Sequence, residues 1–464
     1  MKKNLSRRDI LRIGGAALGS SAVLGRLVLP RHAQADGSYV SGYKALVCVY
    51  LTGGNNGFNM VVPTSSGAYS TYAASRGNLA IGQNTLLALD GTASDGNTYG
   101  MHPSCPELQA LFKSGKLALV CNVGTLVQPT TVAQAQSGSV PLPPQLFSHI
   151  DQTNQWMTSN PQSQDLSGWA GLVADLFASK GVGANLAYNV NIGGTNTWQN
   201  GKTTLPYVLG TSGAPSLNVL GNPYHLNGAR VKVVQDLLGQ AATDPNVMVS
   251  QYQAIVANAD AKVSVVTNAL TAAGDLTTQF PNNSGDGGQS GDSDLDKQLH
   301  EVARVIKANQ QLGDARQIFF VQILGFDTHN GELATHARLL QYVSSYLNNF
   351  WTAMGEIGMQ DSVTVFTMSD FGRTLGSNGD GSDHAWGNHQ LVLGGAVKGG
   401  YYGTMPSLKI GGPDDFSSGR LVPTTSSDQY AATIAQWFGV AQPDLPGVFP
   451  NLHAFSQSNL GFLG

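Results

Sequence analysis

The densest group of reactive side chains lies at residues 369–389, SDFGRTLGSNGDGSDHAWGNH, directly after the apolar run VTVFTM. Only 12% of the chain is charged, yet this segment gathers carboxylates, imidazoles and a guanidinium: Asp370, Arg373, Asp383, His384 and His389. A second group, Asp327 and His329, follows another apolar run. Crowded carboxylates repel one another unless a cation neutralises them, and imidazole and carboxylate are both metal ligands. The two groups therefore indicate a divalent cation, which the sequence leaves open as Zn, Ca, Mg or Mn.

Each of these residues also has a structural interpretation when it is taken alone. A single histidine near a loop commonly serves as a hydrogen-bonded structural residue, and Asp383 could be a turn or N-cap residue. The metal hypothesis depends on the two Asp/His groups meeting in space. That in turn depends on the elements that carry them.

Four continuous apolar runs are the candidate strands that position these groups: Ala45–Leu51, Leu117–Val123, Gln317–Phe326 and Val363–Met368. Continuous runs, rather than alternating ones, are typical of strands covered by helices on both faces. A helical pattern from Glu332 to Ile357 joins the third run to the fourth, as in parallel α/β units. We therefore predict an α/β fold with a mostly parallel sheet and helices on both faces.

In open parallel sheets, ligands bind beyond the carboxyl ends of the strands. The two Asp/His groups follow the third and fourth runs, so we expect them to meet at one edge of the sheet. The segment TGGNNG follows the first run and brings Asn56 to the same edge, where its side-chain carbonyl oxygen could be a further ligand.

Four stretches carry a family resemblance: YLTGGNNGFNMVVP, GFDTHNGELATHARLL, the segment from VTVFTM to GGAVKGG, and LVPTTSSDQYAATIAQWFGV. Through them the chain resembles the exported proteins of domain-of-unknown-function family 1501, in the alkaline phosphatase and sulfatase-like superfamily. The resemblance implies a metal-dependent hydrolase of phosphate or sulfate esters. It matches Asp327 and His329 to the acidic and imidazole ligands, with His384 and His389 as further ligand candidates.

Two residues are candidates for the chemical step that the resemblance implies. Arg373 would suit a bidentate contact to a phosphate or sulfate oxygen. Ser148, in LPPQLFSHIDQTNQW, precedes a helical pattern whose N-terminus favours an anion, and a nearby cation would activate its hydroxyl as a nucleophile. The alternative for Ser148 is that it only caps the helix.

The chain departs from the family pattern at two positions. Asn56 stands where the family commonly has an aspartate, and Phe371 replaces the histidine of an Asp-His pair that would begin at Asp370. Both changes weaken the same second metal position. Two hypotheses therefore stay open: a single-metal ester hydrolase, and a catalytically degenerate member that acts as an exported binding or assembly protein with a protein partner.

The N-terminus predicts export. The twin arginines Arg7 and Arg8 precede a mildly apolar stretch that ends in a small-x-small cleavage pattern at Ala35. The stretch is short, rich in Gly and Ala, and interrupted by Arg26, so it is a poor membrane span. We predict a twin-arginine signal peptide over residues 1–35, the twin-arginine export machinery as a partner, a periplasmic or secreted location, and no stable membrane span after cleavage.

Removing residues 1–35 leaves 18 basic and 28 acidic residues, a net charge of −10 that argues against nucleic acid as a partner. Cys48 and Cys121 lie in apolar runs and are expected to be small buried side chains, while any pairing among the three cysteines stays open. We predict one α/β domain over residues 36–464. It contains a partly helical insertion at about 180–290 and a flexible linker at about 280–294.

Overall fold

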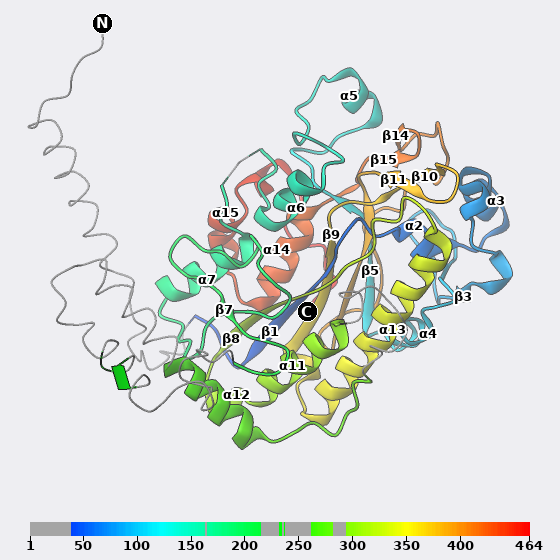
Figure 1. Ribbon diagram of the computed structural model, residues 1–464. Helices are drawn as coiled ribbons and strands as arrows, with labels where there is room; N and C mark the ends of the chain where they lie inside the picture. Colours follow the sequence, from blue (N-terminus) through cyan, green and yellow to red (C-terminus); the bar gives the residue numbers. More distant parts are fainter. Residues whose placement is uncertain (1–38, 163–164, 215–231, 234–235, 237–260, 282–293) are drawn as a thin grey trace, which may run out of the picture.

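The computed structural model describes residues 39–162, 165–214, 232–233, 236, 261–281 and 294–464 (Figure 1). The predicted signal peptide at 1–35 lies outside the described residues. So do residues 282–293 of the predicted linker and a large part of the predicted insertion.

The described residues form a central nine-stranded sheet in the order β13-β5-β12-β9-β1-β8-β6-β7, with β16 paired to β5. The strands are β1 (Lys44–Leu51), β5 (Leu117–Gly124), β6 (Asn189–Asn191), β7 (Tyr207–Val208), β8 (Arg316–Ile323), β9 (Val363–Ser369), β12 (Asn388–Gly394), β13 (Gly400–Tyr402) and β16 (Thr425–Ser426). The pairings are parallel except those of β12, which runs antiparallel to β5 and β9. The predicted mostly parallel sheet is confirmed.

Alternate residues of β1 pack against two separate layers of helices. Val47 and Val49 belong to a core shared with α4 (Pro106–Lys113), α11 (Leu295–Lys307) and α13 (Glu332–Glu356). Leu46 and Cys48 face α7 (Trp169–Ser179), α14 (Ser427–Phe438) and α15 (Leu445–Val448). Each fully buried Val or Leu in these layers contributes about 1.5–3 kcal/mol. Helices therefore cover both faces, as predicted.

Local signals set the helix ends. Ser426 caps α14 through a capping box with Gln429, and Gly439 follows its last residue. α12 (Asn309–Leu312) ends at Gly313, which adopts a left-handed conformation. Cys48, Cys105 and Cys121 are buried and unpaired.

The remaining elements surround the sheet. Three small sheets are formed by β10 (Arg373–Ser377) with β11 (Ser382–His384), by β14 (Asp415–Ser417) with β15 (Arg420–Leu421), and by β2 (Val61–Pro63), β4 (Tyr99–Met101) and β3 (Leu87–Ala88). The further α-helices are α2 (Gly57–Met60), α3 (Ser66–Arg76), α5 (Val132–Ser137) and α6 (His149–Thr158).

Two strands from the predicted insertion, β6 and β7, join the edge of the central sheet beside β8. No helix in the described part of the chain combines the length and apolarity needed to cross a bilayer.

The register of the central strands determines which loops meet. Leu51, at the end of β1, lies opposite Ile323 of β8 on one side and Ser369 of β9 on the other. Three parallel strands thus end at the same level. The loops that follow them carry Gly53, Asp327 and Asp370 to a common edge.

Candidate metal centre

Gly53, in the loop after β1, contacts two aspartates at this edge, Asp327 and Asp370. Asp370 follows β9, and its Oδ1 accepts a hydrogen bond of 3.0 Å from the backbone N–H of Gly53. The backbone of Asp327 passes so close to Gly53 that a Cβ added there would lie 2.3 Å from the Asp327 nitrogen. Gly53 also has φ +116°, which residues with side chains rarely adopt. Gly53 is therefore required for both carboxylates to approach the same point.

His149 brings an imidazole to these aspartates from α6, of which it is the first residue. Its Nδ1 lies 2.6 Å from Oδ2 of Asp370, and its Nε2 lies 3.5 Å from Oδ2 of Asp327. The hydrogen bond to Asp370 raises the pKa of His149. The preceding loop holds Gln145 and Phe147 at positive φ, 52° and 73°, a conformation unusual for bulky residues.

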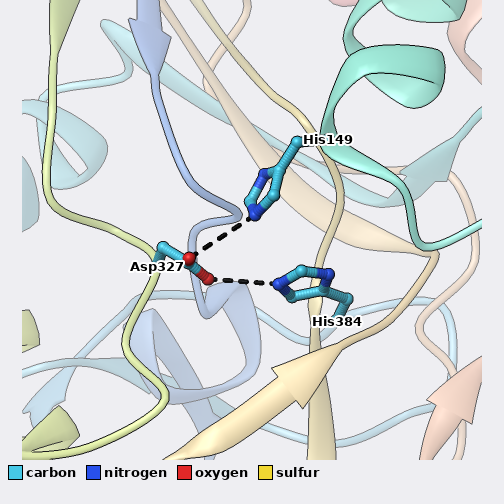
Figure 2. Close-up of side chains that lie close together, drawn as sticks. All are labelled: His149, Asp327 and His384. Atoms are coloured by element: carbon cyan, nitrogen blue, oxygen red, sulfur yellow. Dashed lines mark hydrogen bonds and ion pairs between the residues drawn. The ribbon is translucent and has the colours of Figure 1, made fainter.

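His384, the last residue of β11, approaches Asp327 beside His149 (Figure 2), and the two imidazole ring centroids lie 4.4 Å apart. Its Nδ1 lies 2.8 Å from the carbonyl oxygen of Phe147, so Nδ1 carries the proton and Nε2 keeps its lone pair. That Nε2 lies 3.2 Å from Oδ1 of Asp327. Burial lowers the pKa of His384, which favours the neutral imidazole that metals bind.

His329 completes the group. Its Nε2 lies 3.1 Å from Oδ1 of Asp327 and 2.9 Å from Nε2 of His384, while its Nδ1 lies 3.3 Å from Oδ1 of Asp383. Asp383 itself accepts a 3.0 Å hydrogen bond from Asn378, the main cause of its lowered pKa. Asp383 therefore lies outside the group and orients His329.

The donor set fits a zinc-like cation. All three histidines place Nδ1 against an outer acceptor and direct Nε2 toward Asp327, the arrangement usual for histidines that bind metals. Ligand atoms of His149, Asp327 and His384 lie within 4.8 Å of one another. Bonds of about 2.0–2.2 Å in a tetrahedral site separate neighbouring donors by roughly 3.3–3.5 Å, close to the 3.5 Å and 3.2 Å that separate the carboxylate oxygens of Asp327 from Nε2 of His149 and Nε2 of His384. A set with three nitrogens and one carboxylate suits zinc better than calcium or magnesium, which prefer oxygen.

Arg373 holds the carboxylate of Asp327 from inside the protein. The guanidinium is fully buried and donates to Oδ1 of Asp327 at 2.9 Å and to the carbonyl oxygen of Ser382 at 2.5 Å. Burial raises the pKa of Asp327, but the hydrogen bond and the charge of Arg373, together with His329 and His149, lower it by more, so the net shift is downward. Arg373 thus keeps Asp327 ionised; its two terminal nitrogens donate to protein groups, and its Nε is buried without a partner among the described residues.

Phe371 packs in the position where the family pattern has a histidine. Its ring centroid lies 4.8 Å from that of His149 and 4.5 Å from that of His384. The imidazole beside Asp370 therefore comes from α6 rather than from the neighbouring residue in the chain.

The structure does not bring Asn56 into this group. Asn56 caps α2 through its Oδ1, which accepts from the backbone N–H of Asn59 at 3.1 Å, and its Nδ2 donates to Oε1 of Glu332 at 2.5 Å. Glu332 also forms a fully buried salt bridge of 2.9 Å with Arg76 and accepts from the Ser382 hydroxyl. Both polar atoms of the Asn56 side chain are thus engaged in a buried network.

His389 lies on β12 with its ring inside the protein. Its Nδ1 accepts a 3.1 Å hydrogen bond from the backbone N–H of Asn122, and the ring meets Phe58 edge to face. Burial lowers the pKa of His389 to about 3. This environment gives His389 a structural role as a neutral imidazole.

Ser148 occupies the N-cap position of α6, but its side chain makes no capping bond to the backbone. The hydroxyl donates instead to Oδ2 of Asp151 at 2.6 Å. The sequence interpretation of this segment selected Ser148 and passed over the adjacent His149. The signal that could have identified His149 is an imidazole at the first position of a helix that follows a central strand.

A hollow of about 530 Å³ opens beside the group. It is lined by His149, Asp327 and Asp370 and, on α6, by Ile150, Thr153 and Asn154. Ile150 is 76% exposed, an unusual degree for a large apolar side chain. A second hollow, about 350 Å³, lies beside Tyr99 and Met405 and is lined by no histidine.

Fold and site together define an α/β protein with a candidate metal centre at the carboxyl edge of a mostly parallel sheet. The chain matches the model of a protein family of unknown function, DUF1501, over residues 43–446, and therefore belongs to that family. No curated relative matches it.

Solved structures give distant likenesses. A protein of the alkaline phosphatase superfamily from Vibrio parahaemolyticus is 11% identical, with a TM-score of 0.36, over 87% of this chain and 68% of its own. The C-terminal periplasmic domain of EcEptC from Escherichia coli, in complex with zinc, is 12% identical, with a TM-score of 0.35, over 91% of both chains. The lipoteichoic acid synthase LtaP from Listeria monocytogenes is 9% identical, with a TM-score of 0.34, over 91% of this chain and 78% of its own. Likenesses this distant carry no information about substrate or reaction.

Proposed function

We propose that this protein is an exported hydrolase of phosphate or sulfate esters that depends on a divalent cation. One observation carries the proposal. Three imidazoles, each with its Nδ1 engaged elsewhere, direct Nε2 toward the carboxylate of Asp327 beside an open hollow.

The four residues that would hold the cation are His149, Asp327, His329 and His384. When bound, a divalent cation supplies a Lewis acid that polarises an ester oxygen and stabilises negative charge. The chain's own residues hold the ligands in place: Asp370 orients His149, Asp383 orients His329, and the carbonyl oxygen of Phe147 orients His384. Arg373 fixes Asp327 in one position.

We propose water from the open hollow as the attacking group. The Ser148 hydroxyl donates to Asp151, and this bond would have to break before Ser148 could attack. The two hydroxyls that line the hollow, those of Thr52 and Thr153, are hydrogen-bonded to Gln322 and Tyr50.

The same engaged hydroxyls favour a second candidate function. A site that binds a cation but presents no free side-chain nucleophile suits an exported binding or assembly protein with a protein partner. Asn56, committed to Glu332, agrees with this alternative because it leaves a second metal position without its aspartate.

Elemental analysis and hydrolysis assays on the same preparations separate the two functions. The mature chain is purified from exporting cells, and its zinc content is measured together with its cleavage of aryl phosphates and aryl sulfates. His149→Ala, Asp327→Ala and His384→Ala should lose the cation and the hydrolysis together. Asp370→Asn should weaken cation affinity by roughly 10–100-fold. His453→Ala removes an exposed imidazole that bonds Pro450 and is the matched control.

The outcomes differ for each hypothesis. Hydrolysis that disappears with the cation supports the hydrolase. A cation bound at the same residues without turnover of either ester class supports the binding protein. Wild-type protein that takes up no cation, even when zinc is added to the purified chain, contradicts both.

A further inference from the structure

The charged side chains bonded to one another at the candidate metal centre carry a formal charge equal and opposite to that of one divalent cation. Three carboxylates, those of Asp327, Asp370 and Asp383, bond to the imidazoles, and one guanidinium, that of Arg373, bonds to Asp327. Their formal charge is −2, which a divalent cation brings to zero. A cation with its ligands would thus leave little net positive charge for a substrate.

The neighbouring charges add no net positive charge to this balance, and Asp380, whose carboxylate accepts from the backbone N–H of Gly331, makes it more negative. Glu332 is paired with Arg76 inside the protein. Arg420 donates to the carbonyl oxygen of His384, and Asp151 accepts from Ser148, which adds one charge of each sign. The guanidinium of Arg373 is fully buried against Asp327. It therefore cannot reach a second anionic oxygen without leaving its present partners.

The hollow beside the site offers no compensating cation. Among the residues that the structure describes, its lining contains no lysine and no arginine. Beyond His149, α6 contributes only uncharged side chains to the lining: Ile150, Thr153 and Asn154. Ile150, three-quarters exposed, presents an apolar side chain next to His149. This side of the site suits an uncharged organic group.

We infer that the substrate is a singly charged tetrahedral ester, a phosphodiester or a sulfate monoester, whose uncharged group lies against Ile150. This inference rests on the proposed function. In the reaction, water's oxygen forms the new bond to phosphorus or sulfur, and the bond to the leaving oxygen breaks. One proton from water passes to that oxygen and the other is released to solvent, giving an alcohol with a phosphomonoester dianion or with sulfate. A phosphomonoester carries a second negative charge, which meets no exposed cation other than the one already balanced by the carboxylates.

Binding of anions without an ester bond tests the inference apart from turnover. Zinc-loaded mature protein is titrated by calorimetry at pH 8.5 with phenylphosphonate, which carries two charges, and with diphenylphosphinate and benzenesulfonate, which carry one. We expect one of the singly charged anions to bind roughly tenfold or more tightly than phenylphosphonate. Tighter diphenylphosphinate indicates phosphodiesters, and tighter benzenesulfonate indicates sulfate esters. Phenylphosphonate as the tightest ligand overturns the inference.

Two variants test the role of Ile150. Ile150→Asp should keep its zinc content and weaken binding of the preferred singly charged anion by roughly tenfold, because it places a carboxylate in the hollow. Ile410→Asp changes an exposed isoleucine that does not line the hollow and should leave the affinity unaltered. Equal affinities for wild type and Ile150→Asp overturn the placement of the organic group.

Failure of the inference about substrate charge is distinguishable from failure of the proposed ester hydrolase function. If phenylphosphonate binds best and aryl phosphate monoesters are hydrolysed, the ester hydrolase stands and the charge inference falls. If zinc binds but no ester is cleaved and none of the three anions binds, both fall.

Discussion

Replacing Asn56 with aspartate exchanges the donor of a buried hydrogen bond for a second carboxylate. The Asn56 amide donates to Oε1 of Glu332 at 2.5 Å, and both side chains are fully buried. Two unit charges about 3 Å apart at an effective dielectric constant of about 20 repel by roughly 5 kcal/mol. The lost hydrogen bond to a charged group removes about 1.5–3 kcal/mol more. Arg76, 2.9 Å from the same oxygen, offsets part of this, so we expect Asn56→Asp to lose about 3–5 kcal/mol at pH 8.

Urea unfolding at pH 8 and pH 5 measures the effect. The loss should be smaller at pH 5, because one proton shared by the two carboxyl groups removes the repulsion. The double variant Asn56→Asp, Glu332→Gln is the control. It keeps one carboxylate and one amide in contact, so it should recover at least half of the lost stability.

A different result would refute this reasoning. Asn56→Asp could prove as stable as wild type at pH 8 and bind a second equivalent of cation in elemental analysis. In that case residue 56 would face the metal centre, as in the family pattern, and not Glu332.

Three further predictions concern the site edge, the interior and export. Gly53→Ala should cost about 2 kcal/mol or more in urea unfolding and reduce cation affinity, because its φ is +116° and a Cβ meets neighbouring backbone at 2.3 Å. Gly67→Ala, where a Cβ meets nothing within 4 Å, should change stability by less than about 1 kcal/mol. The pKa of His389 is about 3 in the folded protein. Below about pH 6.5 its imidazole therefore takes up a proton in the unfolded chain but not in the folded one, and the free energy of unfolding decreases as the pH is lowered. His389→Asn should remove about 2 kcal/mol of the stability loss between pH 6.5 and pH 5. Replacing Arg7 and Arg8 with lysine should leave uncleaved precursor in the cytoplasm on fractionation, whereas exported wild type should begin at residue 36.

The elements of the fold were predictable because their signals are local. The four apolar runs correspond to β1, β5, β8 and β9, with ends that differ by three residues or fewer, and the pattern from Glu332 to Ile357 corresponds to α13. Burial on both strand faces produces such runs directly in the sequence. β12 escaped prediction as an antiparallel strand because strand direction depends on pairing with β5 and β9, which lie far away in the chain.

The site was predictable only in part, since it depends on side-chain direction at the sheet edge. The two Asp/His groups do meet: Asp327, His329, Asp370, Asp383 and His384 lie within one network. The placement of both groups at the carboxyl ends of parallel strands was enough for that expectation. Whether a residue at this edge faces the open side or the interior is decided by tertiary packing.

Two histidines show this limit. His389 turns inward toward Asn122 because β12 places it on the face that packs against Phe58. His149 reaches the site through a loop in which Phe147 adopts φ 73°. The composition of that loop does not predict this conformation. The sequence therefore indicated the neighbourhood but not the complete set of ligands.

The proposed cation ligands come from residues 149 to 384, on loops after β8, at the start of α6 and at the end of β11. No short fragment contains them all, so a chain emerging during synthesis has nothing that can chelate the ion until β1, β8 and β9 are side by side. Occupancy would therefore report completed assembly of the whole domain. It would also raise the free energy of global unfolding in proportion to the logarithm of free cation concentration above the dissociation constant.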